Sequence, residues 1–281
     1  MPFPKTRWFK KENIEKTMDY PPRNGDIIIT SYPKTGSNRL QYIVLQIISK
    51  GEYFPSFNDC LYSKVPFMEI TGPEAIDNMR GLRMYRNHYR YDMVQKNPKS
   101  KVLYIYRKPE DTLISWYHFL QSVREEQINF DEFCEDFLEG KVEYGNYFDH
   151  VLSYLSHKDD DNLLLVSYEK LHANAGEEIL RIAKFLGEEF YQSLYNNELL
   201  LEKIVEHTSF DYMKKNLVFT LPHNKPSEAS ADESEHVISF FRKGTVGDGK
   251  RSLSLDQLQR LQKRVVETIK DTGVLKQWLD E

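Results

Sequence analysis

The sequence predicts an α/β fold, a single domain in which helices cover both faces of a central parallel β-sheet. Short β-branched and aliphatic runs alternate with segments whose apolar residues recur at helical spacing, which is typical of β–α–β units. With 281 residues, 40% of them hydrophobic, the chain can bury a large core. Neither an internal repeat nor a shift in composition divides it, so we expect one domain over residues 1–281.

Four strands are expected in order along the chain. Residues 26–31 form a β-branched run after Asn24-Gly25, and residues 101–106 form an aliphatic and aromatic run of similar length. Two further candidates lie at 81–85 and 162–168. Their separation by helical patterns favours parallel pairing.

Helices are expected after three of these strands. Pro109 suits the first position of one helix, and residues 179–186 carry an apolar face in another. Ser254-x-x-Gln257 resembles a capping box, which predicts a C-terminal helix and tail over 254–281. Residues 223–236 are polar and predict a mobile surface loop, a candidate lid. The helix after the first strand is indicated by a shared apolar face: Leu40, Ile43, Val44, Ile47 and Ile48.

Composition and charge exclude several classes of function. The net charge of −5 argues against nonspecific nucleic-acid binding. No apolar run approaches the roughly 18 residues that a membrane helix needs, and residues 1–16 lack the apolar region of a signal peptide. Cys60 and Cys134 are too far apart to predict a disulfide scaffold or a Cys-based zinc site. We therefore expect a cytoplasmic enzyme with no membrane or nucleic-acid partner.

The turn after the first predicted strand is a candidate anion site. Lys34, Gly36 and Ser37 stand at a predicted helix N-terminus, where backbone N–H groups, a hydroxyl and an ammonium can bind a phosphate-like oxyanion. The order of residues is not that of a Walker A loop, because Lys34 precedes its glycine. An ordinary strand-to-helix turn is the alternative.

The other strand ends carry cations and a histidine. Arg107 follows one strand, with Ser115 eight residues later, and Arg86 and His88 end another. A magnesium-dependent phosphotransferase would place Asp or Glu there, so we expect no metal and a donor neutralised by side chains. His88 is the group at these ends that can take a proton near pH 7, although a structural histidine is the alternative.

A second anion-binding stretch is expected near the C-terminus. Arg242 and Lys243 are followed by three glycines within six residues, at 244, 247 and 249. Such a loop brings backbone N–H groups and a guanidinium to one phosphate. A solvated basic loop is the alternative.

Together, these segments resemble the cytosolic sulfotransferase family, whose donor is 3′-phosphoadenosine 5′-phosphosulfate (PAPS). Residues 32–37 (YPKTGS) are similar to the family's 5′-phosphosulfate loop, and residues 106–119 to its 3′-phosphate element. Residues 207–216 and the RKGxxGD at 242–248 also match family segments. The resemblance spans about 26–250 and implies a P-loop-like fold with that core.

The resemblance also implies roles for individual residues. Lys34 would contact the oxygen that bridges phosphate and sulfate, His88 would deprotonate an acceptor hydroxyl, and Arg86 would steady the sulfuryl group in transit. The backbone of Thr35, Gly36, Ser37 and Asn38 would hold the 5′-phosphate. The remaining donor contacts would come from Arg39, Arg107, Ser115, Tyr168, Thr208, Phe210, Phe241, Arg242, Lys243 and Gly244.

The sequence departs from the family pattern at several positions. Arg39 replaces a Trp that stacks on adenine, although a guanidinium plane can also stack there. Gly249 replaces another Trp, and residues 250–259 match the family's dimer motif only in part, which leaves a homodimer open. Residues 89–92 after His88 are polar, so the acceptor pocket is expected to be more polar than a usual phenol site.

The leading hypothesis is a sulfotransferase that moves a sulfuryl group from PAPS to a hydroxyl of a small-molecule acceptor and releases adenosine 3′,5′-bisphosphate (PAP). One alternative is a P-loop nucleotide-kinase-like phosphotransferase, and another is a catalytically silent nucleotide-binding protein. The missing Walker A order argues against the first, and the presence of both Lys34 and His88 argues against the second. The sequence does not identify the acceptor.

Overall fold

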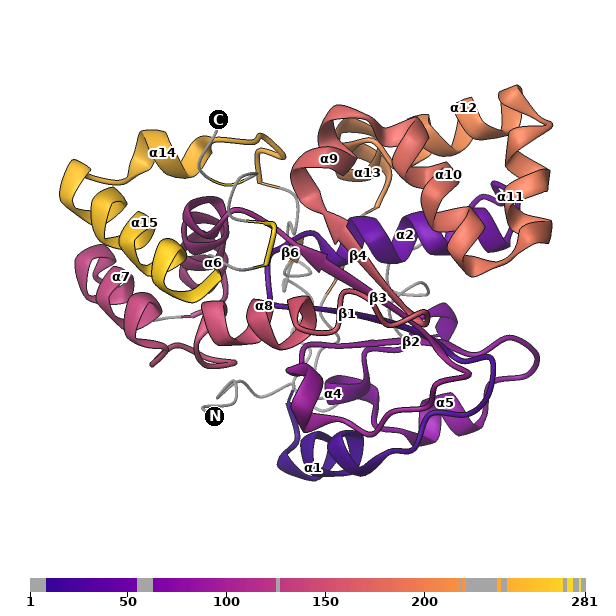
Figure 1. The fold of residues 1–281 in the computed structure, drawn as a ribbon, viewed down its shortest axis with the longest axis horizontal. Coiled ribbons are helices and arrows are strands. Elements are labelled where there is room, and N and C mark those ends of the chain that lie inside the picture. Colours follow the sequence, from indigo (N-terminus) through magenta and orange to yellow (C-terminus); the bar gives the residue numbers. More distant parts are fainter. Residues whose placement is uncertain are drawn as a thin grey trace, which may run out of the picture.

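Four parallel strands form the central sheet, in the order β2-β1-β3-β4 (Figure 1). The computed structural model describes residues 9–54, 63–124, 127–217, 219–220, 237–238, 242–269, 272–274 and 278. Ile27 pairs with Met84 on one side and with Lys101 on the other, and the strands run in the same direction. The predicted parallel α/β fold is thereby confirmed. The strands are β1 Ile27–Ser31, β2 Met84–Asn87, β3 Lys101–Tyr106 and β4 Leu163–Ser167.

Helices lie on both sides of the sheet, as Figure 1 shows. The first group packs on one face and comprises α2 Ser37–Ile48, α9 Tyr168–Ala173, α10 Ala175–Leu186, α11 Glu188–Tyr195, α12 Glu198–His207 and α13 Phe210–Asn216. The second group lies on the other face and comprises α6 Pro109–Val123, α7 Phe130–Glu139, α8 Tyr147–Leu155, α14 Asp248–Ser252 and α15 Leu255–Ile269. A third group lies beside β2 and comprises α1 Lys11–Asp19, α4 Met68–Thr71 and α5 Glu74–Asp77.

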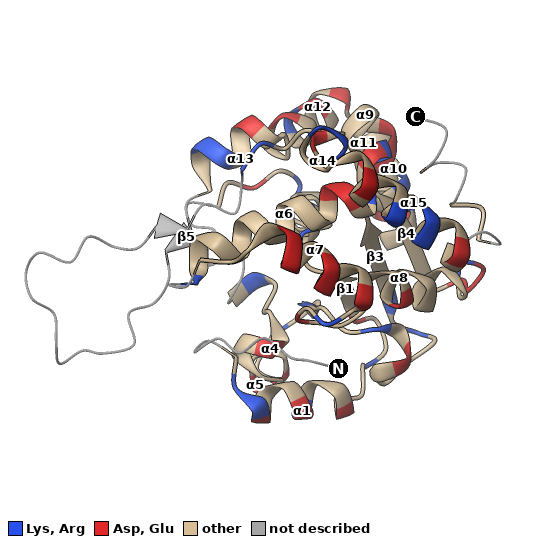
Figure 2. Ribbon diagram, turned by 90° about the vertical axis from the view of Figure 1, so that its left-hand side faces the viewer, with Lys and Arg blue, Asp and Glu red and all other residues tan. Residues whose placement is uncertain are grey.

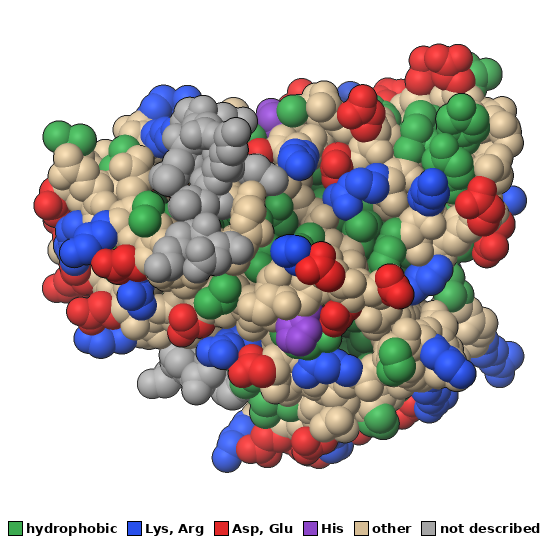
Figure 3. Space-filling view, in the orientation of Figure 1, with side chains coloured by type: hydrophobic (Ala, Val, Ile, Leu, Met, Phe, Trp, Pro, Cys, Tyr) green, Lys and Arg blue, Asp and Glu red, His purple; other side chains and the backbone are tan. Residues whose placement is uncertain are grey.

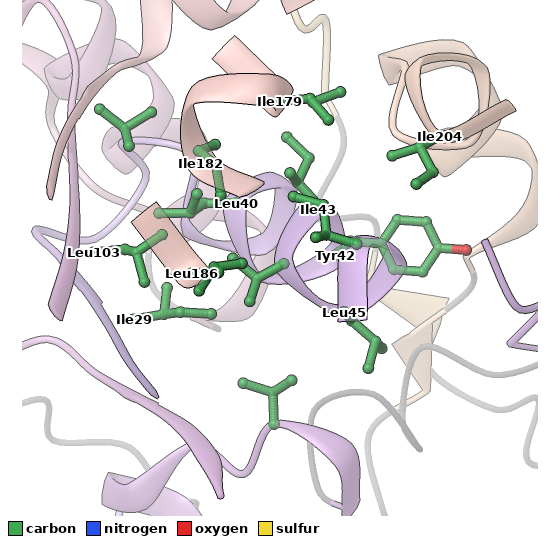
Figure 4. Packing of buried hydrophobic residues seen from close by; sticks show 14 of the residues in the cluster. Ile29, Leu40, Tyr42, Ile43, Leu45, Leu103, Ile179, Ile182, Leu186 and Ile204 are labelled. Carbon is green, nitrogen blue, oxygen red and sulfur yellow. The ribbon is translucent and has the colours of Figure 1, made fainter. Parts of the chain in front are cut away.

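Successive side chains of β1 point to opposite faces of the sheet and pack against different helices. Ile27 and Ile29 belong to the buried cluster under α2 and α10, whereas Ile28 packs with α4 and α5 on the other face. Figure 4 shows the first cluster, in which labelled side chains from β1 and β3 meet those of α2, α10 and α12. Burying this much apolar surface fixes α2 against the sheet, and with it the turn that precedes α2. The labelled side chains are Ile29, Leu40, Tyr42, Ile43, Leu45, Leu103, Ile179, Ile182, Leu186 and Ile204.

The predicted strand at 81–85 is wrong in its bounds, because β2 spans Met84–Asn87. Gly81 has a φ of +81°, which a β-ladder does not accept, so pairing starts three residues later. The strands predicted at 26–31 and 162–168 are each shorter, and Tyr168 instead begins α9.

The predicted capping box is confirmed at the start of α15. The Gln257 N–H donates to Ser254 Oγ at 3.2 Å, and the Ser254 N–H donates to Gln257 Oε1 at 2.9 Å. Earlier in the chain, β5 Phe219–Thr220 pairs antiparallel with β6 Val237–Ile238. The loop predicted at 223–236 lies outside the described residues.

The outer helices carry charges of both signs. Lys or Arg occurs among Asp and Glu along α1, α12 and α15 (Figure 2). Hydrophobic side chains gather at the α10–α12 end of the molecule (Figure 3), where Tyr195 and Leu199 are exposed. Within the described ranges, none of the helices is long and apolar enough to span a bilayer.

Candidate active site

The carboxyl ends of the four strands meet at one edge of the sheet, and most of the predicted site residues lie there. Lys34 follows β1, Arg86 lies within β2 with His88 just after it, and Arg107 follows β3. The sheet order is β2-β1-β3-β4, so β1 and β3 are neighbours. From β1 the chain continues to β2 on one side, whereas from β3 it continues to β4 on the other side. Ligands of open α/β sheets bind at such a switch point.

The turn between β1 and α2 is held by its own side chains. Thr35 Oγ1 is fully buried and hydrogen bonds to the carbonyl oxygens of Tyr32 at 2.8 Å and Ile105 at 3.0 Å. Gly36 has a φ of +109°, and a Cβ there would lie 2.6 Å from Tyr168 Cδ2. The Thr35 hydroxyl therefore stabilises the turn, and the glycine lets the backbone at the N-terminus of α2 approach the Tyr168 ring.

Lys34 lies in the same turn with a φ of +69°, in the left-handed region that non-glycine residues rarely adopt. Its Nζ lies 4.2 Å from the centroid of the Phe119 ring. Burial, followed by the charges of three neighbouring guanidinium groups, lowers the pKa of Lys34 to about 7. They belong to Arg107, Arg242 and Arg86, so the fold brings together cations from four separate segments.

His88 is buried, and its surroundings determine which nitrogen carries the proton. Nδ1 lies 2.8 Å from the carbonyl oxygen of Ser31, which can only accept a hydrogen bond. Nδ1 must therefore be the protonated nitrogen, which leaves a lone pair on Nε2. Burial, with the positive charge of Arg86 as the next cause, lowers the pKa of His88 well below its usual 6.5. At neutral pH the ring is an uncharged base.

Arg86 connects the end of β2 with the first turn of α2. Its guanidinium donates to Asn38 Oδ1 at 2.5 Å and lies 4.3 Å from the centroid of the Phe67 ring. The same ring contacts His88 edge to face, with centroids 5.0 Å apart. Asn38 and His88 are thus both linked to Arg86, the first by a hydrogen bond and the second through the Phe67 ring.

Arg107 lies at the junction of β3 and α6. Its guanidinium lies 4.3 Å from the centroid of the Tyr168 ring and donates to the Thr245 carbonyl oxygen at 2.9 Å. It also pairs with the buried Asp111 at 3.3 Å. Ser115 is half-buried two helical turns farther along α6. Arg107 therefore contacts the second anion-binding stretch, at 242–249, through the Thr245 carbonyl oxygen.

The segment at 242–249 is attached to α6 by the Asp111 carboxylate and held internally by the Asp248 carboxylate. Asp111 accepts the N–H groups of Gly247 at 2.9 Å and Gly249 at 2.7 Å. Asp248 accepts from Arg242 at 2.6 Å and from Lys243 at 3.0 Å. Arg242 and Lys243 are thereby fixed on the segment whose Thr245 carbonyl oxygen accepts from Arg107, and Arg242 lies near enough to Lys34 to lower its pKa.

The residues predicted at the adenine end also lie close together. Arg39 Nε donates to the carbonyl oxygen of Thr208 at 3.0 Å, whereas the Thr208 hydroxyl bonds to Ile204 within its own helix. Phe210 lies so close to Gly244 that a Cβ on the glycine would be 2.1 Å from its ring. Arg39 thus tethers α2 to the end of α12, and Phe241 lies outside the described residues.

Comparisons with known proteins agree with this geometry. The model of the sulfotransferase domain matches residues 24–273. Mouse sulfotransferase 1B1 is 34% identical over 260 residues, covering 88% of this chain and 84% of that protein. The chain belongs to the sulfotransferase family. The predicted resemblance is therefore confirmed, and neither the kinase-like nor the silent alternative is favoured.

Two solved structures share the fold of this sulfotransferase. Mouse sulfotransferase SULT7A1 complexed with PAP superposes with a TM-score of 0.74 at 24% identity, covering 98% of this chain and 94% of the other. Retinol dehydratase in a complex with retinol and PAP gives a TM-score of 0.71 at 20% identity, covering 94% and 87%. At these identities the likeness establishes the fold.

Sequence reasoning missed two buried residues that contact the main chain of His88 in this sulfotransferase. Glu69 accepts the His88 N–H at 2.6 Å, and His150 Nε2 lies 3.2 Å from the His88 carbonyl oxygen. Glu69 lies in the four-residue helix α4 and His150 in the middle of α8. Neither position carries a motif signal, because each contact depends on tertiary packing across the chain.

Proposed function

We propose that this sulfotransferase moves the sulfuryl group of PAPS to a hydroxyl of a small-molecule acceptor, with His88 as the general base. The observation that carries the proposal is the tautomer of His88. Its Nδ1–H is engaged by the Ser31 carbonyl oxygen, and its low pKa leaves Nε2 unprotonated at neutral pH. This base lies at the same sheet edge as the cation-rich turn that contains Lys34.

The donor is PAPS, and it lies across the ends of β1 and β3. The backbone of residues 35–38 takes the 5′-phosphate at the N-terminus of α2. Arg107, Ser115 and the segment at 242–244 take the 3′-phosphate, which distinguishes PAPS from ATP or ADP. Tyr168, Thr208, Phe210, Arg39 and Phe241 surround the adenine. Support comes from the two similar structures, both of which are complexes with PAP.

The reaction is an in-line displacement at sulfur. His88 Nε2 takes the proton of the acceptor hydroxyl as its oxygen forms a bond to sulfur. The bond between sulfur and the bridging phosphate oxygen breaks, and its electron pair leaves with PAP. Lys34 neutralises the charge that develops on this oxygen, and Arg86 steadies the sulfuryl group as it moves. These cations perform the charge neutralisation that a metal performs in phosphoryl transfer.

The acceptor is a small molecule whose hydroxyl reaches His88. The rings of Phe67 and Tyr144 contact His88 at centroid distances of 5.0 and 5.5 Å, so aromatic surface lies beside the base. One of the similar structures holds retinol, a small-molecule alcohol. A hydroxyl on an apolar or aromatic skeleton fits this environment.

Calorimetric titration without metal tests the donor class. PAP is expected to bind much more tightly than ADP, because ADP lacks the 3′-phosphate. Equal affinities, or binding of ATP only with magnesium, would contradict the proposal. His88→Ala then tests the base: transfer to an acceptor should be lost while PAP binding is kept, because proton abstraction belongs to the transition state. Normal turnover by this variant would remove His88 from the role.

A further inference from the structure

The main chain of His88 is held from both sides by buried side chains. Glu69 Oε1 accepts the His88 N–H at 2.6 Å, and His150 Nε2 lies 3.2 Å from the His88 carbonyl oxygen. Glu69 is 1% exposed and His150 is fully buried. Because β2 ends at Asn87, the sheet ladder does not hold His88 in place. The two side chains replace the ladder at this one residue.

The Glu69 carboxyl group does not contribute to the stability of the fold in proportion to its burial. Burial raises its pKa to about 8, and Oε2 has no hydrogen-bond partner among the described residues. A buried carboxyl group with half of its capacity unused loses more by desolvation than one hydrogen bond returns. The position of Glu69 is nevertheless fixed relative to His88. Phe67, two residues before Glu69, forms an isolated parallel β-bridge with Arg86 in β2, two residues before His88.

His150 is held in a single tautomer. The His88 carbonyl oxygen can only accept, so Nε2 of His150 carries the proton and Nδ1 accepts from the Tyr104 hydroxyl at 2.9 Å. Burial lowers the pKa of His150 to about 3, which keeps the ring neutral. A chain of two hydrogen bonds therefore runs from β3, through α8, to the main chain of His88.

The residues on either side of His88 are held by hydrogen bonds of their own. Asn87 Oδ1 accepts from Thr30 Oγ1 at 3.0 Å, and the Tyr154 hydroxyl donates to the Tyr89 carbonyl oxygen at 2.9 Å. Directional hydrogen bonds thus fix the chain before and after His88, and those of Glu69 and His150 fix the main chain of His88 itself.

We propose that Glu69 and His150 are positioning residues, which fix the backbone of His88 so that its ring stays on the Ser31 carbonyl oxygen and presents Nε2 to the acceptor. The proposal rests on the base role of His88 given above. Neither residue touches the reacting atoms, so its effect falls on the rate of transfer and not on binding of the donor. A misplacement of about 1 Å in a catalytic group costs on the order of 100-fold in rate.

Glu69→Leu and Glu69→Gln form the first matched pair. Leucine removes the acceptor for the His88 N–H, whereas the glutamine carbonyl keeps it. We expect kcat to fall on the order of 100-fold in Glu69→Leu, with PAP affinity and acceptor KM nearly unchanged, and most of the activity to return in Glu69→Gln. A kcat in Glu69→Leu within twofold of the parent protein would overturn the proposal. Equal losses in both variants would also overturn it, since the acceptor oxygen that glutamine retains would then not be what matters.

His150→Phe and His150→Gln form the second pair, since glutamine can place an N–H near Nε2 while phenylalanine cannot. The nitrogen NMR spectrum of the His88 ring supplies a readout that a general loss of structure does not imitate. The parent protein should show a single Nδ1–H tautomer, and Glu69→Leu and His150→Phe should lose it while still binding PAP. An unchanged tautomer in both would contradict the proposal. If His88→Ala itself turned over normally, the proposed function would fail first, which separates the two failures.

Discussion

Lys34 illustrates how a residue can be suited to a ligand before the ligand arrives. Its ammonium lies among three guanidinium groups, and burial brings its pKa to about 7 in the ligand-free protein. An ordinary lysine would be charged at every physiological pH, whereas this one is largely uncharged at pH 8. A phosphosulfate or phosphate beside it reverses the balance and raises the pKa again. Binding and protonation of Lys34 are therefore coupled.

The coupling predicts uptake of protons when PAP binds. At pH 8 Lys34 is mostly neutral in the free protein and charged in the complex, so the protein should take up close to one proton on binding PAP. For the same reason, the affinity for PAP should fall as the pH rises above 7. Calorimetry in buffers of different ionisation enthalpy measures this number directly. Lys34→Met is the control, in which the uptake should disappear. Undiminished uptake in the control would assign the proton to another group.

At the scale of elements, the segment at 242–249 and helix α6 act as one unit. Asp111 in the first turn of α6 accepts two backbone N–H groups of this segment, and Gly249 approaches the Glu110 backbone closely. A Cβ at Gly249 would lie 2.3 Å from the Glu110 carbonyl carbon, which cannot move without disturbing α6. This contact leaves room only for glycine at position 249 of this chain.

Gly249→Ala is expected to separate these two elements. The added methyl group should lower the free energy of unfolding by about 1–3 kcal/mol through overpacking and weaken PAP binding as well. Gly176→Ala is the matched control, because nothing lies within 4 Å of a Cβ there and the residue is inside α10. The control should retain or gain stability. Urea denaturation and PAP titration measure both effects, and equal behaviour of the two variants would refute the role of the Gly249 contact.

The elements also show what a sequence can reveal. The turn at 32–37 could be predicted because its function depends on local features, namely a β-branched strand, a glycine and a helix start. The bounds of β2 could not, because the predicted run begins with the left-handed Gly81 and the exposed Leu82, whereas the strand itself ends with the polar Arg86 and Asn87. Glu69 and His150 were missed for a different reason. Their partners lie 19 and 62 residues away along the chain, and no local pattern encodes such contacts.

At the scale of the molecule, the proposed donor site is assembled from distant parts of one chain. The 5′ end of the ligand would meet the turn after β1, and its 3′ end would meet the start of α6 and the segment at 242–249. A ligand that bridges these parts stabilises only the folded state. At about 100 times its Kd, it should add about 2.7 kcal/mol to the free energy of unfolding.

Arg107→Ala tests whether the 3′-phosphate supplies the bridge. Arg107 contacts Asp111, Thr245 and the Tyr168 ring, so it lies where α6, the C-terminal segment and α9 meet. Removal of its side chain should weaken the binding of PAP more than that of ADP, by on the order of 2–5 kcal/mol in binding free energy. It should also abolish most of the thermal shift that PAP produces. Thermal unfolding with PAP, with ADP and without nucleotide separates this loss from a general loss of stability. Equal weakening of PAP and ADP binding would contradict a contact between Arg107 and the 3′-phosphate, because a contact specific to that phosphate cannot affect a ligand that lacks it.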